Sequence, residues 1–265
     1  MAVFVSKKDR HPPSCDGKVD DRDWQVWYSL PAQSTDPASL PTNMKVLVLG
    51  ATGPVGLLLV QEALEAQHSL VLLVRSPQKL PEWIQTHPSI TVVEGQLTDA
   101  ELVDKTVSGV DAILSALGPP VTVTSGITYS SHKPLAHAYA LVVEAMKKHG
   151  VKRLLLLGTA SMKDEHDKFS VVFAALVTGV ALFAHNAYRD VVAIGEIIRA
   201  QGESLDWTIV RVPVLTSDET KEVVAGYVGD GHVKPKLSRA GFASFVLKEL
   251  EQGEWLCKAP LISSP

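Results

Sequence analysis

The residues whose spacing most clearly predicts chemistry are three glycines, Gly50, Gly53 and Gly56. They follow an apolar run and precede an expected helix. In such a strand–turn–helix unit, the first glycine permits a tight turn and the second lets the backbone approach a diphosphate. The third lets the helix pack against the strand, and the helix N-terminus adds free N–H groups and partial positive charge. The pattern predicts a dinucleotide site, with a purely structural glycine turn as the alternative. Its expected residues are Gly50, Thr52, Gly53, Pro54, Val55 and Gly56.

The end of the second expected strand indicates which dinucleotide is bound. NAD sites usually carry an Asp or Glu about 20 residues beyond the glycines, on the ribose hydroxyls. Here the strand is followed by Arg75, with no acid before Glu82. A guanidinium at this place can bind a ribose 2′-phosphate. We therefore expect NADP(H) as the cofactor, the alternative being a solvated arginine at a strand end.

Three further strand ends are expected at the same edge, because ligands of such sheets bind beyond the carboxyl ends of the strands. Leu97 follows the third strand, where adenine is expected. Ala116, Leu117 and Gly118 follow the fourth strand, and the small side chains in this segment let the backbone lie against the cofactor. Thr159 follows the fifth, near the expected nicotinamide.

The strands and helices that position these motifs can be predicted from apolar runs that alternate with helical stretches. The strands are expected at Lys45–Leu49, Leu70–Val74, Ile90–Val93, Val110–Leu114, Arg153–Leu157 and Trp207–Arg211. The helices are expected at Pro54–Gln67, Ala100–Val107, Leu135–His149 and Asn186–Gln201. Because the strands are apolar throughout, they predict a parallel, doubly wound α/β sheet. A strand at Val223–Val228, a helix at Ser238–Glu251 and a short strand near Trp255 complete the expected domain, residues 44–265.

Composition narrows the class of protein. The chain has 265 residues, 46% hydrophobic and 20% charged, with a net charge of −4, which is typical of a globular protein without a nucleic-acid surface. Two cysteines provide no disulfide framework and no metal pair, so we expect no metal and a cytoplasmic location. Residues 1–43 hold five of the sixteen prolines and predict an irregular, mobile extension.

These motifs together resemble the atypical short-chain dehydrogenase/reductase superfamily, in particular its NmrA-like, NAD(P)H-binding branch, which includes flavin/biliverdin reductases. The matching segments include residues 48–56, 73–75, 95–99, 111–118, 145–153, 205–211 and 237–240. A weaker match is to fungal tailoring oxidoreductases. The resemblance implies a Rossmann fold, NADP(H) and a small C-terminal substrate region. Gln96 stands where the family usually has Asp, so its side chain is assigned no role.

The resemblance also shows where catalytic residues are expected. Standard members use Ser and a Tyr-x-x-x-Lys pair on the helix after the fifth strand. Tyr129 and Lys133 have this spacing but precede a different helix, so we expect them to be noncatalytic. At the family position stand His185 and Tyr188, and Thr159 matches the serine. These three are the candidate catalytic residues, with a solvent proton as the alternative to either donor.

Other polar residues near these candidates are expected to have roles outside catalysis. Asp190 and Glu196 are expected to organise that helix, and Arg211 is expected to border the substrate pocket. The acidic residues between Asp164 and Asp167 predict a solvated loop, not a metal site.

The longest apolar stretch, residues 169–184, is interrupted by Ser170, Thr178 and Gly179 and is short for a bilayer, which needs about 20 apolar residues. It predicts a buried or lid helix, and we expect no membrane partner. Its largest side chains are candidates for the walls of a pocket for a flat or aromatic substrate, or for ordinary core packing. They are Phe169, Phe173, Leu176, Leu182 and Phe183.

The sequence thus predicts an NADPH-dependent oxidoreductase acting on a small carbonyl, quinone or flavin-like compound. Two alternatives stay open: a noncatalytic NADP(H)-binding regulator, and a cofactor-retaining isomerase or dehydratase. The oligomeric state is not predicted.

Overall fold

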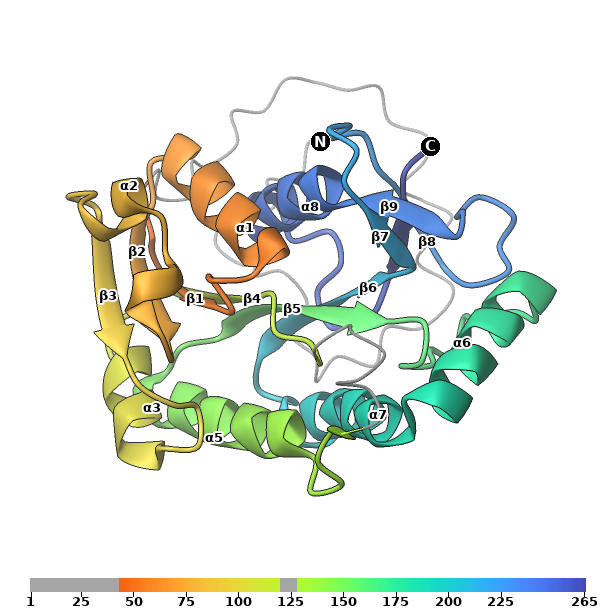
Figure 1. Ribbon diagram of the computed structural model, residues 1–265, viewed down its shortest axis with the longest axis horizontal. Coiled ribbons are helices and arrows are strands. Elements are labelled where there is room, and N and C mark those ends of the chain that lie inside the picture. Colours follow the sequence, from red (N-terminus) through yellow and green to blue (C-terminus); the bar gives the residue numbers. More distant parts are fainter. Residues whose placement is uncertain (1–42, 120–127) are drawn as a thin grey trace, which may run out of the picture.

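A computed structural model describes residues 43–119 and 128–265 of the chain. Its centre is an eight-stranded sheet with the order β3-β2-β1-β4-β5-β6-β10-β8 (Figure 1). All neighbours are parallel except β10 and β8, which are antiparallel. The order reverses between β1 and β4, so a ligand crevice is expected beyond the carboxyl ends of these two strands.

The strands of this sheet are β1 Lys45–Leu49, β2 Ser69–Val74, β3 Ile90–Glu94, β4 Ala112–Ser115, β5 Arg153–Thr159, β6 Asp206–Val212, β8 Val224–Gly226 and β10 Leu261–Ser263. Two short strands, β7 Val214–Thr216 and β9 Lys236–Ser238, form a separate parallel pair. The helices are α1 Pro54–Glu65, α2 Glu82–Gln85, α3 Ala100–Val107, α5 Pro134–His149, α6 Val171–Phe183, α7 His185–Gln201 and α8 Arg239–Gln252, with the 3-10 turn η2 Pro77–Lys79.

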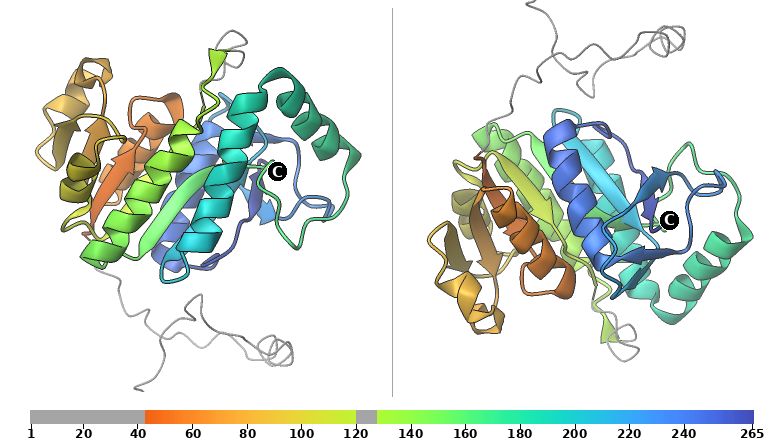
Figure 2. Two further views of the ribbon diagram at one scale, coloured as in Figure 1. Left: turned by 90° about the horizontal axis from the view of Figure 1, so that it is seen from below. Right: turned by 90° about the horizontal axis from the view of Figure 1, so that it is seen from above.

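The helices cover both faces of the sheet and make three layers. Figure 2 shows α5 and α7 side by side on one face, with α1 and α8 on the other. Each face has its own apolar core, one built with α3, α5 and α7 and the other with α1 and α8. Parallel strands buried on both faces explain why the runs are apolar without alternation. The predicted doubly wound, Rossmann-like fold is confirmed.

The predicted elements differ from the structure mainly at their ends. Helix α1 stops two residues early, and Gln67 takes a positive φ of 64° in the turn that follows. Strand β4 starts at Ala112, two residues later than expected, and the Asp111 side chain before it accepts a hydrogen bond from the Lys45 backbone N–H at 2.7 Å. The strand expected near Trp255 is wrong: that segment is a turn, and the strand lies at Leu261–Ser263.

The predicted extension, residues 1–43, lies outside the described part of the chain apart from Asn43. Within the residues that the structure describes, no single helix is long and apolar enough to cross a bilayer. Helices α6 and α7 pass such a length and composition test only as a pair, and the pair is bent by 118° at its junction.

Candidate active site

The turn between β1 and α1 has the geometry that its first and third glycines predict. Gly50 has a φ of +81°, a conformation that residues with a Cβ rarely adopt. A Cβ there would also lie 3.0 Å from the carbonyl carbon of Ala116, so this turn packs directly on the end of β4. A Cβ on Gly56 would lie 2.1 Å from the Gly50 carbonyl oxygen. Both glycines are therefore required by the fold itself.

Gly53 differs, because nothing inside the protein requires a glycine there. Its φ of −86° and ψ of 161° suit any residue, and an added Cβ would meet only the Gly50 carbonyl oxygen, at an ordinary 3.5 Å. Gly53 is the N-cap of α1, where no side chain caps the helix and the first turn contains no acid. A backbone position without a side chain, next to helix N–H groups that no side chain caps, is the arrangement that binds a diphosphate.

Arg75 follows β2 directly, at the same edge of the sheet. Its side chain is exposed and makes no hydrogen bond or ion pair with any residue the structure describes. Ser76 and the η2 turn follow, and they bring Lys79, also exposed, into the same loop. The carboxyl edge of the sheet therefore carries a cation without a compensating acid at the place where NAD-specific sites carry a carboxylate.

The ends of β3 and β4 form the neighbouring part of the edge. Leu97 is half-buried and packs on the core of the α5 face. Ala116 and Leu117 lie half-buried against the Gly50 turn, and a Cβ on Gly118 would meet nothing within 4 Å. The backbone at Gly118 is thus open to a ligand on this edge.

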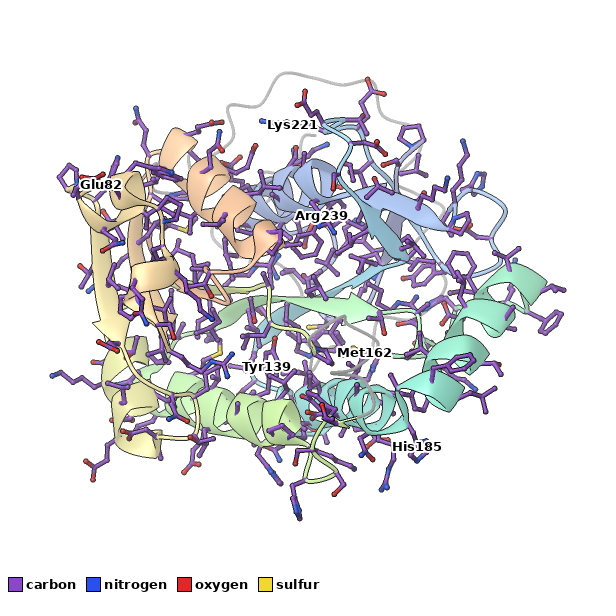
Figure 3. The ribbon with its side chains drawn as sticks, viewed as in Figure 1. Glu82, Tyr139, Met162, His185, Lys221 and Arg239 are labelled. Carbon is purple, nitrogen blue, oxygen red and sulfur yellow. The ribbon has the colours of Figure 1, made fainter. Side chains whose placement is uncertain are left out.

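Below these residues, a buried pair holds the end of β4 to α5. Tyr139 is labelled in Figure 3, and its hydroxyl lies 2.7 Å from the Ser115 hydroxyl. Burial raises the pKa of Tyr139, so its phenol stays protonated. This pair fixes the strand end and presents no group to the crevice.

At the end of β5, Thr159 is half-buried, and its hydroxyl accepts a hydrogen bond from the Ser161 backbone N–H at 3.3 Å. The structure places Thr159 beside the β4 end, as expected, because β4 and β5 are paired in parallel register. Its short turn leads into the loop that carries Met162.

Arg211, expected to border the substrate pocket, is instead a structural residue. Its side chain is fully buried, and its guanidinium donates to both carboxylate oxygens of Asp167, at 2.6 and 2.8 Å. It also donates to the carbonyl oxygens of Met162 and Ala259. The prediction for Arg211 is wrong because the loop after β5 folds back over the strand end and uses the charge internally.

This ion pair also corrects the prediction of a wholly solvated acidic loop. Asp167 accepts hydrogen bonds from the backbone N–H groups of Asp164 and Val228 as well. Burial opposes ionisation of this carboxyl, but the hydrogen bonds from Arg211 and the backbone outweigh it and lower its pKa. Asp167 therefore ties three segments together near the crevice.

The two candidate proton donors lie on the first turn of α7. A helix of this crossover begins at the carboxyl edge of the sheet, so both residues are at the correct edge. His185 is exposed on the outer side, at the junction of α6 and α7 (Figure 3), and Arg189 is exposed one turn later. His185 and Arg189 have the four-residue spacing of the family's Tyr and Lys, and the face of α7 that carries them points to solvent. Tyr188 is half-buried, and its hydroxyl has no hydrogen-bond partner in residues 43–119 and 128–265.

Tyr129 is held by a buried carboxylate. Its hydroxyl donates to Asp190 at 2.7 Å, and burial together with this bond raises the pKa of Tyr129. Asp190 also accepts from the backbone N–H groups of Leu135 and Ala136, and so caps α5 from the neighbouring helix. Asp190 is thus structural, as expected, but the helix that it organises is α5 and not its own helix, α7. A tyrosine with a raised pKa, bound to a carboxylate, is a poor proton donor, which supports the noncatalytic prediction for Tyr129.

The apolar stretch forms the predicted helix, α6, but the helix is not buried, so that part of the prediction is wrong; the lid alternative stays a prediction. Of its five candidate wall residues only Phe173 is buried, packed with Val228 and Leu261. Phe169, Leu182 and Phe183 are 84%, 74% and 81% exposed. These three side chains face solvent, so core packing does not describe them, and a pocket wall stays a prediction.

Comparison with known proteins agrees with the glycine turn. A profile of the NAD(P)H-binding family matches residues 50–253, which is most of the chain. The chain belongs to this family. The predicted resemblance to an NAD(P)H-binding branch is confirmed at the level of this family, and solved structures that are 16% and 18% identical share the Rossmann-like fold.

Two curated relatives are distant. The "3 beta-hydroxysteroid dehydrogenase/Delta 5-->4-isomerase" of Mycobacterium tuberculosis is 28% identical over 182 residues, which cover 64% of this chain and 39% of that protein. The chain thus spans less than half the length of this relative. The "Oxidoreductase stcQ" of Emericella nidulans is 28% identical over 190 residues, 66% of each protein.

A solved structure shows the same fold. A short-chain dehydrogenase/reductase of Veillonella parvula, solved in complex with NADP, superposes with a TM-score of 0.66. It is 16% identical, with 84% of this chain and 95% of that chain covered.

Proposed function

We propose that this protein is an NADP(H)-dependent reductase of a small carbonyl, quinone or flavin-like compound. The observation that carries the proposal is Gly53, a glycine that the fold does not need, at an uncapped helix N-terminus. Family membership supplies the class of ligand, and the exposed guanidinium of Arg75 favours the phosphorylated form. The Veillonella structure supports this choice, because it binds NADP on the same fold.

The residues of the crevice have distinct proposed roles toward the cofactor. Thr52, Gly53, Val55 and Gly56 offer backbone groups to the diphosphate, and Arg75 binds the 2′-phosphate. Leu97 borders the adenine. Ala116, Leu117 and Gly118 form the surface along which the cofactor lies.

When bound, NADPH supplies the hydride, and the protein supplies orientation and a proton. Thr159 is proposed to orient the substrate oxygen at the end of β5. For the proton, Tyr188 is the better placed of the two candidates, since its half-buried hydroxyl is unpaired. His185, on the outer side, is the alternative donor.

A noncatalytic NADP(H)-binding regulator is the second candidate function. One observation favours it: His185 and Arg189, which have the spacing of the catalytic Tyr and Lys, face solvent. With Tyr129 bound to Asp190, the described residues contain no Tyr–Lys pair directed at the crevice.

The two functions are separated by measuring binding first and turnover second. NADPH is titrated against the full chain by fluorescence, and absorbance at about 340 nm is then followed with quinones, flavins and aldehydes. We expect binding and oxidation of NADPH with at least one class, with activity reduced in Tyr188→Phe and binding unchanged. Tight binding without oxidation over the whole panel contradicts the reductase and supports the regulator.

A further inference from the structure

The exposed apolar residues of this protein are concentrated on one helix. Of the nine large apolar side chains exposed in the described residues, seven lie between Phe169 and Phe183, and the other two, Trp83 and Val214, are isolated. We call these seven the α6 surface. They are Phe169, Val171, Val172, Leu176, Val180, Leu182 and Phe183.

The α6 surface extends around most of the helix. Only Phe173 is buried, whereas the residues before and after it along the helix are exposed or half-exposed. Helix α6 lies at the edge of the molecule, beyond the end of α7 and outside the three layers (Figure 1). A helix that is apolar all round is normally buried in a protein core or in lipid.

We propose that the α6 surface binds the surface of an anionic lipid bilayer. A folded partner covers one side of a helix, whereas lipid surrounds every side that the protein leaves exposed. Lipid therefore fits this pattern better than a second copy of the chain. The proposal concerns peripheral binding, which our sequence prediction of no membrane partner did not anticipate.

The length of α6 limits how it can bind. Its 13 residues extend about 20 Å, which is too short to cross a hydrocarbon core of about 30 Å. The α6 surface is therefore expected to insert part-way into one leaflet, with the charged residues that flank it at the headgroups.

Charges around α6 suit anionic headgroups. Lys168 precedes the helix, Arg189 follows its junction with α7, and both are exposed without an ion pair in the described chain. No Asp or Glu lies between them. The nearest acids on either side, Asp167 and Asp190, are occupied by Arg211 and by the α5 N-terminus. The cations therefore remain available to lipid phosphates.

Vesicle flotation with the full chain tests this proposal. Vesicles are made of phosphatidylcholine alone, or with one part phosphatidylserine to three of phosphatidylcholine. We expect binding to the anionic vesicles at least about tenfold stronger than to the neutral ones, and weaker binding at high salt. Wild-type protein that floats with neither vesicle contradicts the proposal.

A double variant locates the binding surface. Leu182→Ser with Phe183→Ser removes two of the most exposed side chains and is expected to weaken vesicle binding at least about tenfold. The matched control, Trp83→Ser with Val214→Ser, removes two exposed apolar side chains elsewhere and should bind like wild type. Equal loss in both variants, or no loss in the first, overturns the assignment to α6.

Two further measurements keep the test decisive. Hydrogen exchange on the wild-type chain should show protection of residues 169–183 on adding anionic vesicles, whatever the stability of the variants. Analytical ultracentrifugation without lipid detects the competing occupant. A concentration-dependent dimer that the α6 double variant abolishes, together with no vesicle binding, identifies a second copy and overturns the lipid proposal.

Discussion

Replacing Gly53 with alanine should separate cofactor binding from folding. Gly53 has φ and ψ values open to any residue, and an added Cβ would have only one contact, at 3.5 Å. Such a substitution gains about 0.4–1 kcal/mol through the unfolded chain. Because Gly53 is the N-cap of α1 and alanine is a poorer N-cap than glycine by a comparable amount, the net stability and the Tm should stay close to those of wild type.

Gly53→Ala should weaken the binding of the cofactor. The new methyl group would stand on the backbone surface that we propose for the diphosphate, and would push it away from the N–H groups of α1. Loss of close approach should raise the Kd for NADPH at least about tenfold, or about 1.4 kcal/mol. The variant is thus expected to be about as stable as wild type and to bind NADPH more weakly.

Two other glycines serve as matched controls. Gly56→Ala places a Cβ 2.1 Å from a carbonyl oxygen and should destabilise the fold by about 1–3 kcal/mol. Gly179→Ala lies in α6, where a Cβ meets nothing within 4 Å, and should raise stability without changing NADPH binding. Thermal unfolding followed by circular dichroism gives the stability, and calorimetric titration gives the Kd.

One result refutes this reasoning. If Gly53→Ala binds NADPH as tightly as wild type while remaining folded, the diphosphate does not approach the backbone at Gly53. The site built on this turn would then be wrong, whatever the stability of the variant.

Three other predictions concern the ion pair, the helix cap and the proton donor. Asp167→Asn leaves Arg211 buried without its counter-charge, and should lower the free energy of unfolding at neutral pH by about 3 kcal/mol in urea titration. Because folding lowers the pKa of Asp167, its contribution to wild-type stability should be complete above the unfolded-state pKa near 3.8. That contribution should be lost as pH falls through the lower folded-state pKa. If Asp167→Asn shows the same dependence of unfolding free energy on acid pH as wild type, this reasoning is contradicted. Asp190→Ala removes the α5 cap and should cost about 2–4 kcal/mol, with a smaller loss in Asp190→Asn; equal stability of all three proteins excludes the cap. Tyr188→Phe should lower kcat about 100-fold at unchanged Kd for NADPH if this hydroxyl gives the proton, and an unchanged kcat assigns that role to His185 or solvent.

The sheet could be predicted from the sequence because its strands are buried on both faces. Runs such as Lys45–Leu49 and Arg153–Leu157 are apolar at every position after the first, which distinguishes them from the half-polar helices between them. The three-residue strands β7 and β9 were missed, since a stretch so short has no readable period. Strand β10 was misplaced because its position depends on pairing with β6 and β8, not on its own pattern.

The cofactor motif was readable because each glycine has a separate physical reason. By contrast, nothing in the sequence around Arg211 distinguishes a guanidinium that meets a substrate from one that meets Asp167, because the two are 44 residues apart. The exposure of α6 was equally hidden. Apolar composition predicts burial, and only the placement of α6 beyond the three layers leaves its side chains in solvent.

The account depends on a diphosphate at the Gly53 turn and a 2′-phosphate at Arg75. The most direct test is isothermal titration of the purified full chain with NADP⁺ and with NAD⁺, repeated with Arg75→Ala. We predict that NADP⁺ binds at least about tenfold more tightly than NAD⁺, and that Arg75→Ala removes this difference while leaving NAD⁺ binding unchanged. Binding of neither dinucleotide to the folded wild-type protein contradicts the account, and a preference for NAD⁺ contradicts the role of Arg75.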